Sequence, residues 1–348
     1  MKVLIIGQGL AGTILSFKLI QKGHDVTVVD DPSLKKSSLV AGGMVNPVVF
    51  RRLTKSWMID ELYPEFIKTS EELETLLDVQ LFYPKTIFRV LGKDEDSFWQ
   101  KKYIDNGLEK YIDREPAYFP ISKYLKIPFG YGKVKVGGWF DIQTLISTYN
   151  NYLKENSQLI SAHIDISYDL KFSSHKVDWK GNNYDKVILC TGSAEEKNNV
   201  FKQVKFKNTL GDVLTIKSDE YSNDHIVSKN IFILPIQNNK FKTGSTFRWD
   251  FNDSQPSENA KQEITEKLNK IADFNYIIED HQAGVRPTTN DRRPVIGFLK
   301  DNPCLGIMNG LGSKGILLSS WVANQLINKM EHPQYEIHPE IDLNRYYK

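Results

Sequence analysis

The first thirty residues divide into apolar runs separated by glycine-rich or polar breaks. Val3–Ile6 is a continuous apolar run, which is typical of a parallel strand buried on both faces. Apolar positions then recur at helical spacing through Leu15 and Leu19 until Gly23. The run Asp25–Val29 predicts a second strand. This order predicts a strand–helix–strand unit of a parallel sheet.

The segment that joins the first strand to the helix has the pattern of a dinucleotide-binding turn. Gly7 permits a tight turn, Gly9 lets the backbone approach a pyrophosphate, and Gly12 lets the helix pack closely on the strand. Asp30 lies eighteen residues after Gly12, where it can accept a hydrogen bond from a ribose hydroxyl. Phosphates bind well at the unpaired N–H groups of a helix N-terminus. The predicted contacts are made by Gly7, Gly9, Leu10, Ala11, Gly12 and Asp30.

Two later segments repeat this nucleotide-binding pattern. Tyr184–Gly192 contains a β-branched run that ends in Thr191-Gly192, which indicates another buried strand of the same sheet. Cys304–Asn309 is a short apolar run followed by the glycine-rich segment Gly310–Gly315 and a helical pattern. The N-terminus of that helix would face an anionic group. The alternative interpretation of Gly310–Gly315 is an ordinary turn between a strand and a helix, without a role in binding.

The remaining segments have a different composition. Pro84–Val136 and Lys205–Asp250 are rich in aromatic and β-branched residues, which predicts antiparallel strands of a second, mixed sheet. Ala260–Ile271 has the pattern of an amphipathic helix in the same layer. The predicted fold class is α/β, with an interrupted Rossmann-like nucleotide-binding domain and a second domain built on the mixed sheet. The predicted boundaries are 1–83, 137–204 and 284–348 for the first domain, and 84–136 and 205–283 for the second.

Charge and composition narrow the possible partners. The chain has 348 residues, 45 of them basic and 43 acidic, so its net charge of +2 gives no electrostatic reason to expect nucleic acid or a membrane surface. No apolar run is long enough to span a bilayer. Cys190 and Cys304 form no disulfide framework, which favours a reduced cytoplasmic setting, and the histidines lack metal-ligand spacing.

The glycine-rich segment Gly310–Gly315 favours a flavin over a nicotinamide cofactor, because nicotinamide dehydrogenases normally contain only the N-terminal strand–helix–strand unit. Taken in order, the motifs resemble the FAD-dependent D-amino acid oxidase superfamily. That superfamily includes glycine oxidase, monomeric sarcosine oxidase and the oxidase half of a bifunctional enzyme that modifies the tRNA wobble uridine. The resemblance spans essentially the whole chain. The matching segments are Gly7–Gly12 with Asp30, Ser37–Met44, Gly137–Asp141, Thr191-Gly192, Gly284–Pro287 with Asp291, Pro294–Gly297 and Gly312–Ile316.

The resemblance implies a noncovalently bound FAD. Ser37 and Ser38 would hydrogen-bond its phosphate or ribose, and Lys36 would add charge near the pyrophosphate. The turn after the last strand would face the pyrimidine edge of the flavin, where negative charge collects on reduction. The other residues implied at the cofactor are Gly42, Gly43, Met44, Thr191, Gly192, Leu311, Gly312, Ser313, Lys314, Gly315 and Ile316.

Arg286, in the segment Gly284–Pro287, is the residue implied to bind substrate. In the amino acid oxidases an arginine in this setting holds the substrate carboxylate. A planar two-point donor fixes the α-carbon against the flavin, which lysine would not do. The alternative is that Arg286 pairs internally, with Asp291 as a possible partner, and only braces the strand.

Lys242 is the second implied catalytic residue. In sarcosine oxidase-like enzymes a lysine two residues before a glycine such as Gly244 lies over the flavin and helps oxygen react, because a fixed cation stabilises developing negative charge. The alternative, favoured by the usual exposure of lysine, is a solvent-facing strand residue that alternates with Lys240. Five aromatic residues are candidates for a substrate pocket or, more commonly, for plain core: Trp57, Tyr63, Trp139, Phe247 and Trp249.

The expected activity is oxidation of the carbon–nitrogen bond of a small amino acid or secondary amine. Hydride would pass to FAD, and oxygen or another acceptor would reoxidise it. One alternative is an oxidase that acts on a carboxymethylaminomethyl group of uridine in tRNA, although the sequence has no basic stripe to hold RNA. The other alternative is a flavin-binding redox partner that turns over no amine.

Overall fold

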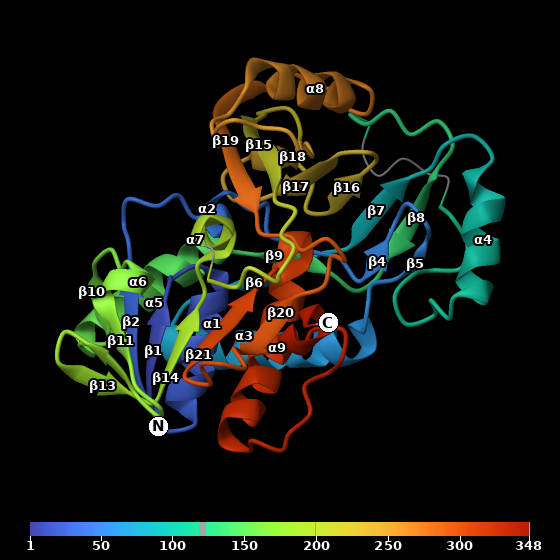
Figure 1. Cartoon of the computed structure of the whole chain (residues 1–348). Helices are drawn as coiled ribbons and strands as arrows, with labels where there is room; N and C mark the ends of the chain where they lie inside the picture. Colours follow the sequence, from blue (N-terminus) through green and yellow to red (C-terminus); the bar gives the residue numbers. More distant parts are fainter. Residues whose placement is uncertain (118–122, 199, 348) are drawn as a thin grey trace.

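The computed structural model describes residues 1–117, 123–198 and 200–347 and is built around two large β-sheets. Figure 1 shows the first sheet at the lower left and the second above it and to the right. The first sheet has six strands in the order β10-β2-β1-β14-β21-β20. All neighbours in it are parallel except β20 and β21. Its strands are β1 (Lys2–Ile6), β2 (Asp25–Asp30), β10 (Leu159–Ser161), β14 (Lys186–Leu189), β20 (Val295–Phe298) and β21 (Leu305–Asn309).

The central strand β1 is covered on both faces, as its continuous apolar run predicts. Val3 and Ile5 belong to the hydrophobic core shared with the helices. Leu4 and Ile6 belong to a second core formed with a small three-stranded sheet. The helices are α1 (Leu10–Gln21), α3 (Ile59–Leu77), α5 (Ile142–Glu155) and α9 (Gly315–Glu331), and the small sheet contains β11 (Leu170–Phe172), β12 (Val177–Trp179) and β13 (Asn182–Tyr184).

The strand order places the glycine-rich turns together. Strands β2 and β10 lie on one side of β1, and β14, β21 and β20 lie on the other. The strand order therefore reverses at β1, and a crevice is expected between the carboxyl ends of β1 and β14. Gly7 follows β1, Thr191-Gly192 follows β14, and Asn309 ends β21 at the same edge. The three segments that share one pattern in the sequence therefore meet at one edge of one sheet.

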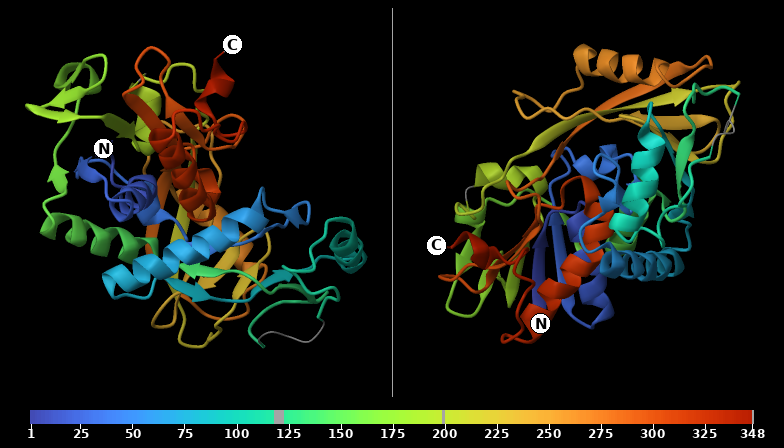
Figure 2. Two further views of the ribbon diagram at one scale, coloured as in Figure 1. Left: turned by 90° about the horizontal axis from the view of Figure 1, so that it is seen from below. Right: turned by 90° about the vertical axis from the view of Figure 1, so that its right-hand side faces the viewer.

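The second sheet has seven strands in the order β19-β15-β18-β17-β16-β7-β8. It is mixed, because β16 pairs in parallel with β7 while its other pairs are antiparallel. Helix α8 (Glu258–Asn269) lies on the face turned away from the first sheet (Figure 2), where Ile264 and Leu268 join the core of this layer. The strands are β7 (Ile87–Val90), β8 (Tyr131–Val134), β15 (Thr209–Lys217), β16 (Ile226–Ser228), β17 (Phe232–Pro235), β18 (Lys240–Gly244) and β19 (Ile277–Arg286).

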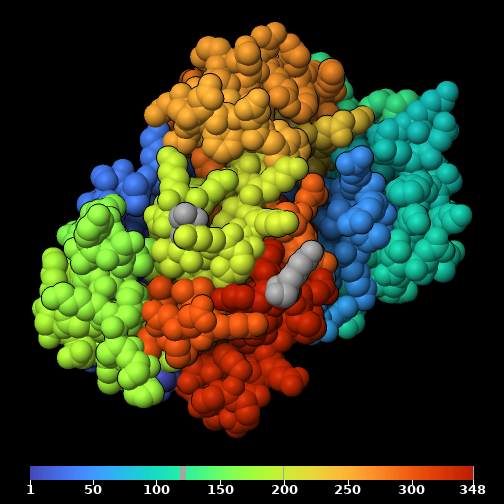
Figure 3. Space-filling model, viewed as in Figure 1, coloured from blue at the N-terminus to red at the C-terminus, as the bar shows by residue number. Residues whose placement is uncertain are grey.

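The other helices and strands that the structure describes lie outside the two large sheets. They are α2 (Ser37–Val40), α4 (Glu95–Asp105), α6 (Ile166–Asp169), α7 (Glu195–Asn198), β3 (Met44–Val45), β4 (Val48–Val49), β5 (Thr54–Lys55), β6 (Phe82–Pro84) and β9 (Gly138–Phe140), with 3₁₀ turns at Gly192–Ala194, Gly312–Lys314 and Leu343–Tyr346. In the space-filling view the blue N-terminal residues meet the orange segment at the upper left (Figure 3). A hydrogen bond of 2.9 Å from Lys35 Nζ to Gln255 Oε1 joins these two parts of the chain.

One helix departs from the sequence-based expectation. The segment Pro84–Val136 contains α4 in addition to strands, and its residues 118–122 lie outside the described part of the chain. Helix α3 contains Pro64 in its second turn, where the proline takes away one backbone donor of the helix. The predicted domain boundaries stay a prediction. Within the part of the chain that the structure describes, no helix combines the length and apolar character needed to cross a bilayer.

Candidate functional site

A cavity of about 1750 Å³ lies along the carboxyl edge of the six-stranded sheet and under the seven-stranded sheet. Its walls come from the turn after β1, the end of β2, the 33–46 segment, the turn before α9 and Arg286 at the end of β19. Of the residues predicted from the sequence to bind the cofactor or to be catalytic, all but two line the cavity. Gly12 is buried beneath the first turn, and Lys242 lies behind the cavity wall.

The turn after β1 depends on glycine at two positions for steric reasons. Gly7 has a φ of +104°, and a Cβ there would lie 2.5 Å from Cys190 O. A Cβ on Gly12 would lie 1.9 Å from Gly7 O. At Gly9 an added Cβ would have one described atom within 4 Å, Ser38 Oγ at 3.4 Å, so this part of the protein leaves open space above the backbone. A close approach of a ligand, and not of protein atoms, is what Gly9 permits.

The polar groups near this turn form a small network. Asp30 Oδ1 accepts a hydrogen bond of 2.8 Å from Gln8 N, and Asp30 Oδ2 pairs with Lys36 Nζ at 2.6 Å. Ser38 Oγ accepts from Leu10 N at 3.1 Å. Gly9, as the residue before α1, has no side chain to cap the helix. The lysine that was expected near a pyrophosphate therefore neutralises Asp30, which keeps free lone pairs for a further donor.

Lys314 turns its side chain away from the other residues of the C-terminal glycine turn. Its Nζ donates to Asn46 O at 2.9 Å and to Ser56 Oγ. No carboxylate among the described residues forms an ion pair with it. Burial lowers the pKa of Lys314 to about 8. This buried cation ties the 46–56 segment to the start of α9.

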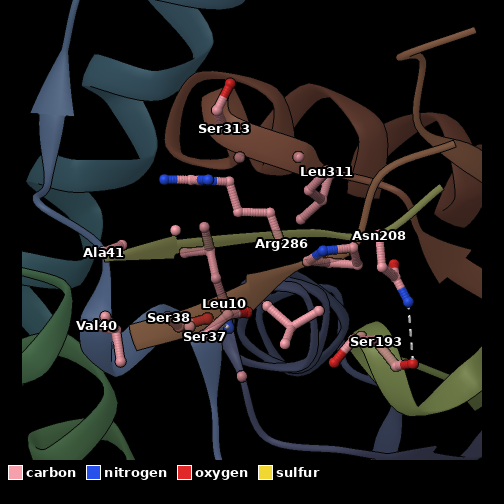
Figure 4. Close-up of a pocket in the computed structure, with 18 of the residues that line it drawn as sticks. Leu10, Ser37, Ser38, Val40, Ala41, Ser193, Asn208, Arg286, Leu311 and Ser313 are labelled. Carbon is pink, nitrogen blue, oxygen red and sulfur yellow. Dashed lines mark hydrogen bonds between the residues drawn. The ribbon is translucent and has the colours of Figure 1, made fainter. Parts of the chain in front are cut away.

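The turn after β14 contains a buried carboxyl group that the sequence did not single out. Thr191 Oγ1 donates to Glu195 Oε2 at 2.7 Å, and burial raises the pKa of Glu195 to about 7. Nearby, Asn208 Nδ2 donates to Ser193 O at 3.4 Å, the contact drawn as a dashed line in Figure 4. Asn208 lines the cavity, and its buried Oδ1 has no partner among the described residues. Such an orphan acceptor indicates a polar ligand group.

Arg286 projects between the Leu311–Ser313 turn and the segment that contains Ala41 (Figure 4). Its Nη2 donates to Ser245 Oγ at 2.7 Å, and its Nη1 donates to Thr246 O at 3.2 Å. Its Cζ lies 4.4 Å from the ring centre of Phe247. Burial lowers the pKa of Arg286 to about 10, so the guanidinium remains charged at neutral pH. Gly211 makes room for it, since a Cβ there would lie 2.0 Å from Nη2.

The suggested internal pair between Arg286 and Asp291 is wrong. Asp291 Oδ2 accepts from Arg345 Nε at 2.9 Å, and its Oδ1 accepts from Thr289 Oγ1. Arg286 makes no ion pair among the described residues. A charged, largely desolvated guanidinium with an open side toward the cavity can bind an anion.

Lys242 is half-buried, so its interpretation as a solvent-facing strand residue does not hold. Its Nζ donates to Ala41 O at 3.3 Å, which places the ammonium behind the Ala41-Gly42-Gly43 wall of the cavity. Burial lowers the pKa of Lys242. Lys240, two residues earlier, pairs with Glu279 at 2.7 Å.

The aromatic candidates separate into two groups. Phe247 and Trp249 line the cavity and are 52% and 54% exposed, so they border its opening. Trp139 is buried and stacks on Tyr83, and Trp57 packs edge-to-face against Trp321. Tyr63 packs near Phe66. Among the residues that the structure describes, no cluster of three metal-ligating side chains occurs.

The model of the FAD-dependent oxidoreductase family, which is named after D-amino acid oxidase, matches residues 2–328. The chain belongs to this family. It is therefore an FAD-dependent oxidoreductase, with the α/β fold of that family.

Curated relatives carry tRNA-modification names. The bifunctional protein MnmC of tRNA 5-methylaminomethyl-2-thiouridine biosynthesis from Legionella pneumophila (strain Corby) is 24% identical over 375 residues, covering 94% of this chain and 54% of that protein. The corresponding protein of Marinobacter nauticus is 21% identical, covering 94% of this chain and 55% of its own length. The chain thus spans about half the length of the curated relatives it matches.

Solved structures share the fold over nearly the whole chain. Iminodiacetate oxidase from Chelativorans superposes with a TM-score of 0.80 at 16% identity, covering 99% of this chain and 98% of that one. Glycine oxidase from Bacillus cereus gives a TM-score of 0.79 at 17% identity, covering 97% and 98%. At these identities the similarity shows the fold alone.

Proposed function

We propose that this protein binds FAD noncovalently in the cavity and oxidises the carbon–nitrogen bond of a small amino acid or secondary amine that carries a carboxylate. The observation that carries this proposal is Arg286, a part-buried guanidinium without a carboxylate ion pair among the described residues, whose open side faces the cavity. The cavity exceeds the volume that a single small ligand needs, so it has room for a dinucleotide and a substrate.

The residues that border the cavity fit FAD. Open space above Gly9 suits a pyrophosphate, and Asp30 has lone pairs left for ribose hydroxyls. The orphan Oδ1 of Asn208 offers a further acceptor along the same wall. When bound, FAD supplies the acceptor for the hydride of the substrate. The proposed cofactor contacts are Gly7, Gly9, Leu10, Ala11, Asp30, Ser37, Ser38, Gly42, Gly43, Met44, Thr191, Gly192, Leu311, Gly312, Ser313, Lys314, Gly315 and Ile316, while Gly12 supports the first turn from beneath.

The protein residues have separate roles in this proposal. Arg286 binds the substrate carboxylate at two points and so fixes the carbon next to nitrogen in one orientation. Phe247 covers the guanidinium and helps to exclude water from the ion pair. Lys242 places a positive charge behind the Ala41 wall, which favours negative charge that develops on oxygen as the acceptor.

The names of the structural neighbours support a substrate of glycine type. Glycine and iminodiacetate both carry an amino nitrogen one carbon away from a carboxylate. A single arginine clamp suits both, because it recognises the part that they share. Glycine and iminodiacetate are therefore the first substrates to test.

A second candidate is oxidation of a carboxymethylaminomethyl uridine in tRNA, favoured by the match to MnmC proteins. It places the same amino-carboxylate group at Arg286 but requires RNA binding. The near-balance of 45 basic and 43 acidic residues does not favour RNA binding. A filter-binding assay with bulk tRNA at moderate salt separates the two candidates, since only the second expects retention of tRNA.

Substitution of Arg286 tests the proposal. Arg286→Ala is expected to raise the KM for glycine or iminodiacetate roughly 10- to 100-fold, the effect of losing hydrogen bonds between charged groups. The affinity for FAD should stay within about twofold. Arg293→Ala is the matched control, because Arg293 pairs with Glu340 at 2.6 Å and does not line the cavity. Equal losses of substrate and FAD affinity in Arg286→Ala would contradict the carboxylate clamp.

A further inference from the structure

Strand β15 contains a fully buried carboxylate, Asp212, which lies close to Arg286 and has no role in the site as described so far. Asp212 is 0% exposed and receives hydrogen bonds from four residues in three separate segments. Thr246 Oγ1 donates at 2.9 Å, Arg248 Nη2 at 2.7 Å and Ser257 N at 3.3 Å. His281 Nε2 lies 3.0 Å from Asp212 Oδ1. A buried carboxylate is tolerated only when it is paired in this way, so these contacts depend strongly on one another.

The backbone beside Asp212 contains a β-bulge. Val213 pairs with Gly244, and the next bridge joins Leu210 to Arg248. Between these pairs two residues of β15, Gly211 and Asp212, oppose the three residues 245–247. Bulges of this kind kink a strand and redirect its groups, and they are frequent beside active sites.

This bulge supplies the groups that contact Arg286. Ser245 Oγ and Thr246 O accept its two hydrogen bonds, and the Phe247 ring covers the guanidinium. The opposing Gly211 provides the space in which the guanidinium lies. Asp212 itself binds the bulge through Thr246 and Arg248, on either side of Phe247. One carboxylate thus holds the backbone that orients the arginine.

We propose that Asp212 is a positioning residue, which fixes the 245–248 bulge so that Arg286 meets a carboxylate in the two-point geometry. This inference rests on the proposed function, because it assumes that Arg286 binds the substrate carboxylate. Asp212 does not line the cavity and acts through Thr246, Arg248 and the backbone of the bulge. Its effect is therefore specific to the charged part of the ligand.

Two buried threonines allow a matched test. Thr246 is 1% exposed and its hydroxyl bonds to Asp212, whereas Thr243 is 0% exposed and its Oγ1 has no partner among the described residues. Thr246→Val and Thr243→Val remove the same atoms from the same part of the chain. The probes are acetate, benzoate and iminodiacetate, with acetamide and benzamide as uncharged comparators. Binding is measured on the FAD-loaded protein from changes in flavin absorbance.

Thr246→Val is expected to weaken carboxylate binding at least about fivefold, the loss of one hydrogen bond in a coupled network. Binding of the amides and of FAD should change less than about twofold, and Thr243→Val should change none of these values beyond that range. In an Arg286→Ala background, Thr246→Val should weaken carboxylate binding no further, because both substitutions remove the same interaction. If Thr246→Val does not fold, Arg248→Met removes a partly exposed partner of Asp212 and is expected to give the same pattern.

Unchanged carboxylate binding in Thr246→Val would overturn the positioning role of Asp212. So would an equal loss for carboxylates and amides, or the same loss with and without Arg286, because these are the results of a merely structural role. The proposed function fails separately. If the parent protein binds carboxylates no better than amides, or if Arg286→Ala has no effect on either, the carboxylate clamp itself is wrong.

Discussion

The two walls of the cavity are built in different ways. On the side of the six-stranded sheet, the residues that line the cavity include those that follow directly after strands, in the turns Gly7–Ala11, Thr191-Gly192 and Leu311–Ile316. On the side of the seven-stranded sheet, Arg286 is held by Ser245, Thr246 and Phe247, some forty positions away along the chain. The first wall depends on local backbone geometry, and the second depends on long-range contacts between side chains.

This difference indicates which ligand a substitution at each wall should affect. At Gly7 and Gly12 of the first wall an added Cβ would meet backbone atoms, which cannot move aside without distorting the turn. At the second wall the loss of a hydroxyl or a charge brings no steric clash, but it leaves the orientation of Arg286 less well fixed. Substitutions at the first wall should therefore act on FAD, and those at the second wall on the substrate or the acceptor.

The largest effect is expected at the glycine turn. Gly12→Val should abolish FAD binding, because its Cβ would lie 1.9 Å from Gly7 O and force the turn apart. Gly9→Ala should leave the fold intact, since only Ser38 Oγ lies nearby, yet weaken FAD binding more than about tenfold by filling the space above the backbone. Fluorescence titration with FAD, together with circular dichroism, measures both outcomes.

A glycine outside the cavity serves as the control. In Gly92→Ala the new Cβ would meet only the flexible side chain of Glu95, with its nearest atom 3.3 Å away, so FAD binding should not change. If Gly9→Ala bound FAD as tightly as the parent protein, the first wall would not be a pyrophosphate site.

An effect on the acceptor is expected at Lys242. Lys242→Met removes the cation behind Ala41 and should slow turnover with oxygen about 100-fold, a typical result of removing one fixed electrostatic group. Turnover with an artificial electron acceptor such as a reducible dye should change much less. Stopped-flow and steady-state rates with both acceptors test this. An equal decrease with both would assign Lys242 to substrate binding or folding.

The last effect concerns stability and not activity: Lys314 contributes a pH dependence to the free energy of unfolding. Burial lowers its pKa to about 8 from 10.5, so the unfolded chain binds more protons than the folded protein between these values. The free energy of unfolding of FAD-free protein should therefore rise across this window, by roughly 3 kcal/mol from this group. Lys314→Met should remove the rise, as urea denaturation at pH 7.5 and 10 would show. An unchanged pH profile in Lys314→Met would contradict the buried charge.

The first wall was predictable from the sequence because its signals are local. A strand followed by glycine and a helix fixes both the fold and the residues at the turn, and the family match confirms the α/β fold and the FAD-dependent class. The lining of the cavity includes Gly9, Asp30 and Leu311, as the motif spacing predicted. Their contacts with FAD stay a proposal.

The second wall was only partly predictable, because its contacts join residues that are far apart in the sequence. Arg286 carries a local signal, the Gly-x-Arg-Pro segment, but its partners Ser245 and Thr246 carry none. Asp212 is one carboxylate among 43 acidic residues, and only the folded pairing of β15 with the bulge sets it apart. Asn208 likewise becomes notable only through the burial of its unpaired oxygen.

The absorbance spectrum of the purified protein, recorded without oxygen before and after addition of glycine or iminodiacetate, tests the central claim most directly. The account predicts a yellow protein whose flavin band disappears with the amine that carries a carboxylate and persists with glycinamide. A colourless protein that takes up no FAD, or a yellow one that no carboxylate-bearing amine bleaches, would contradict it.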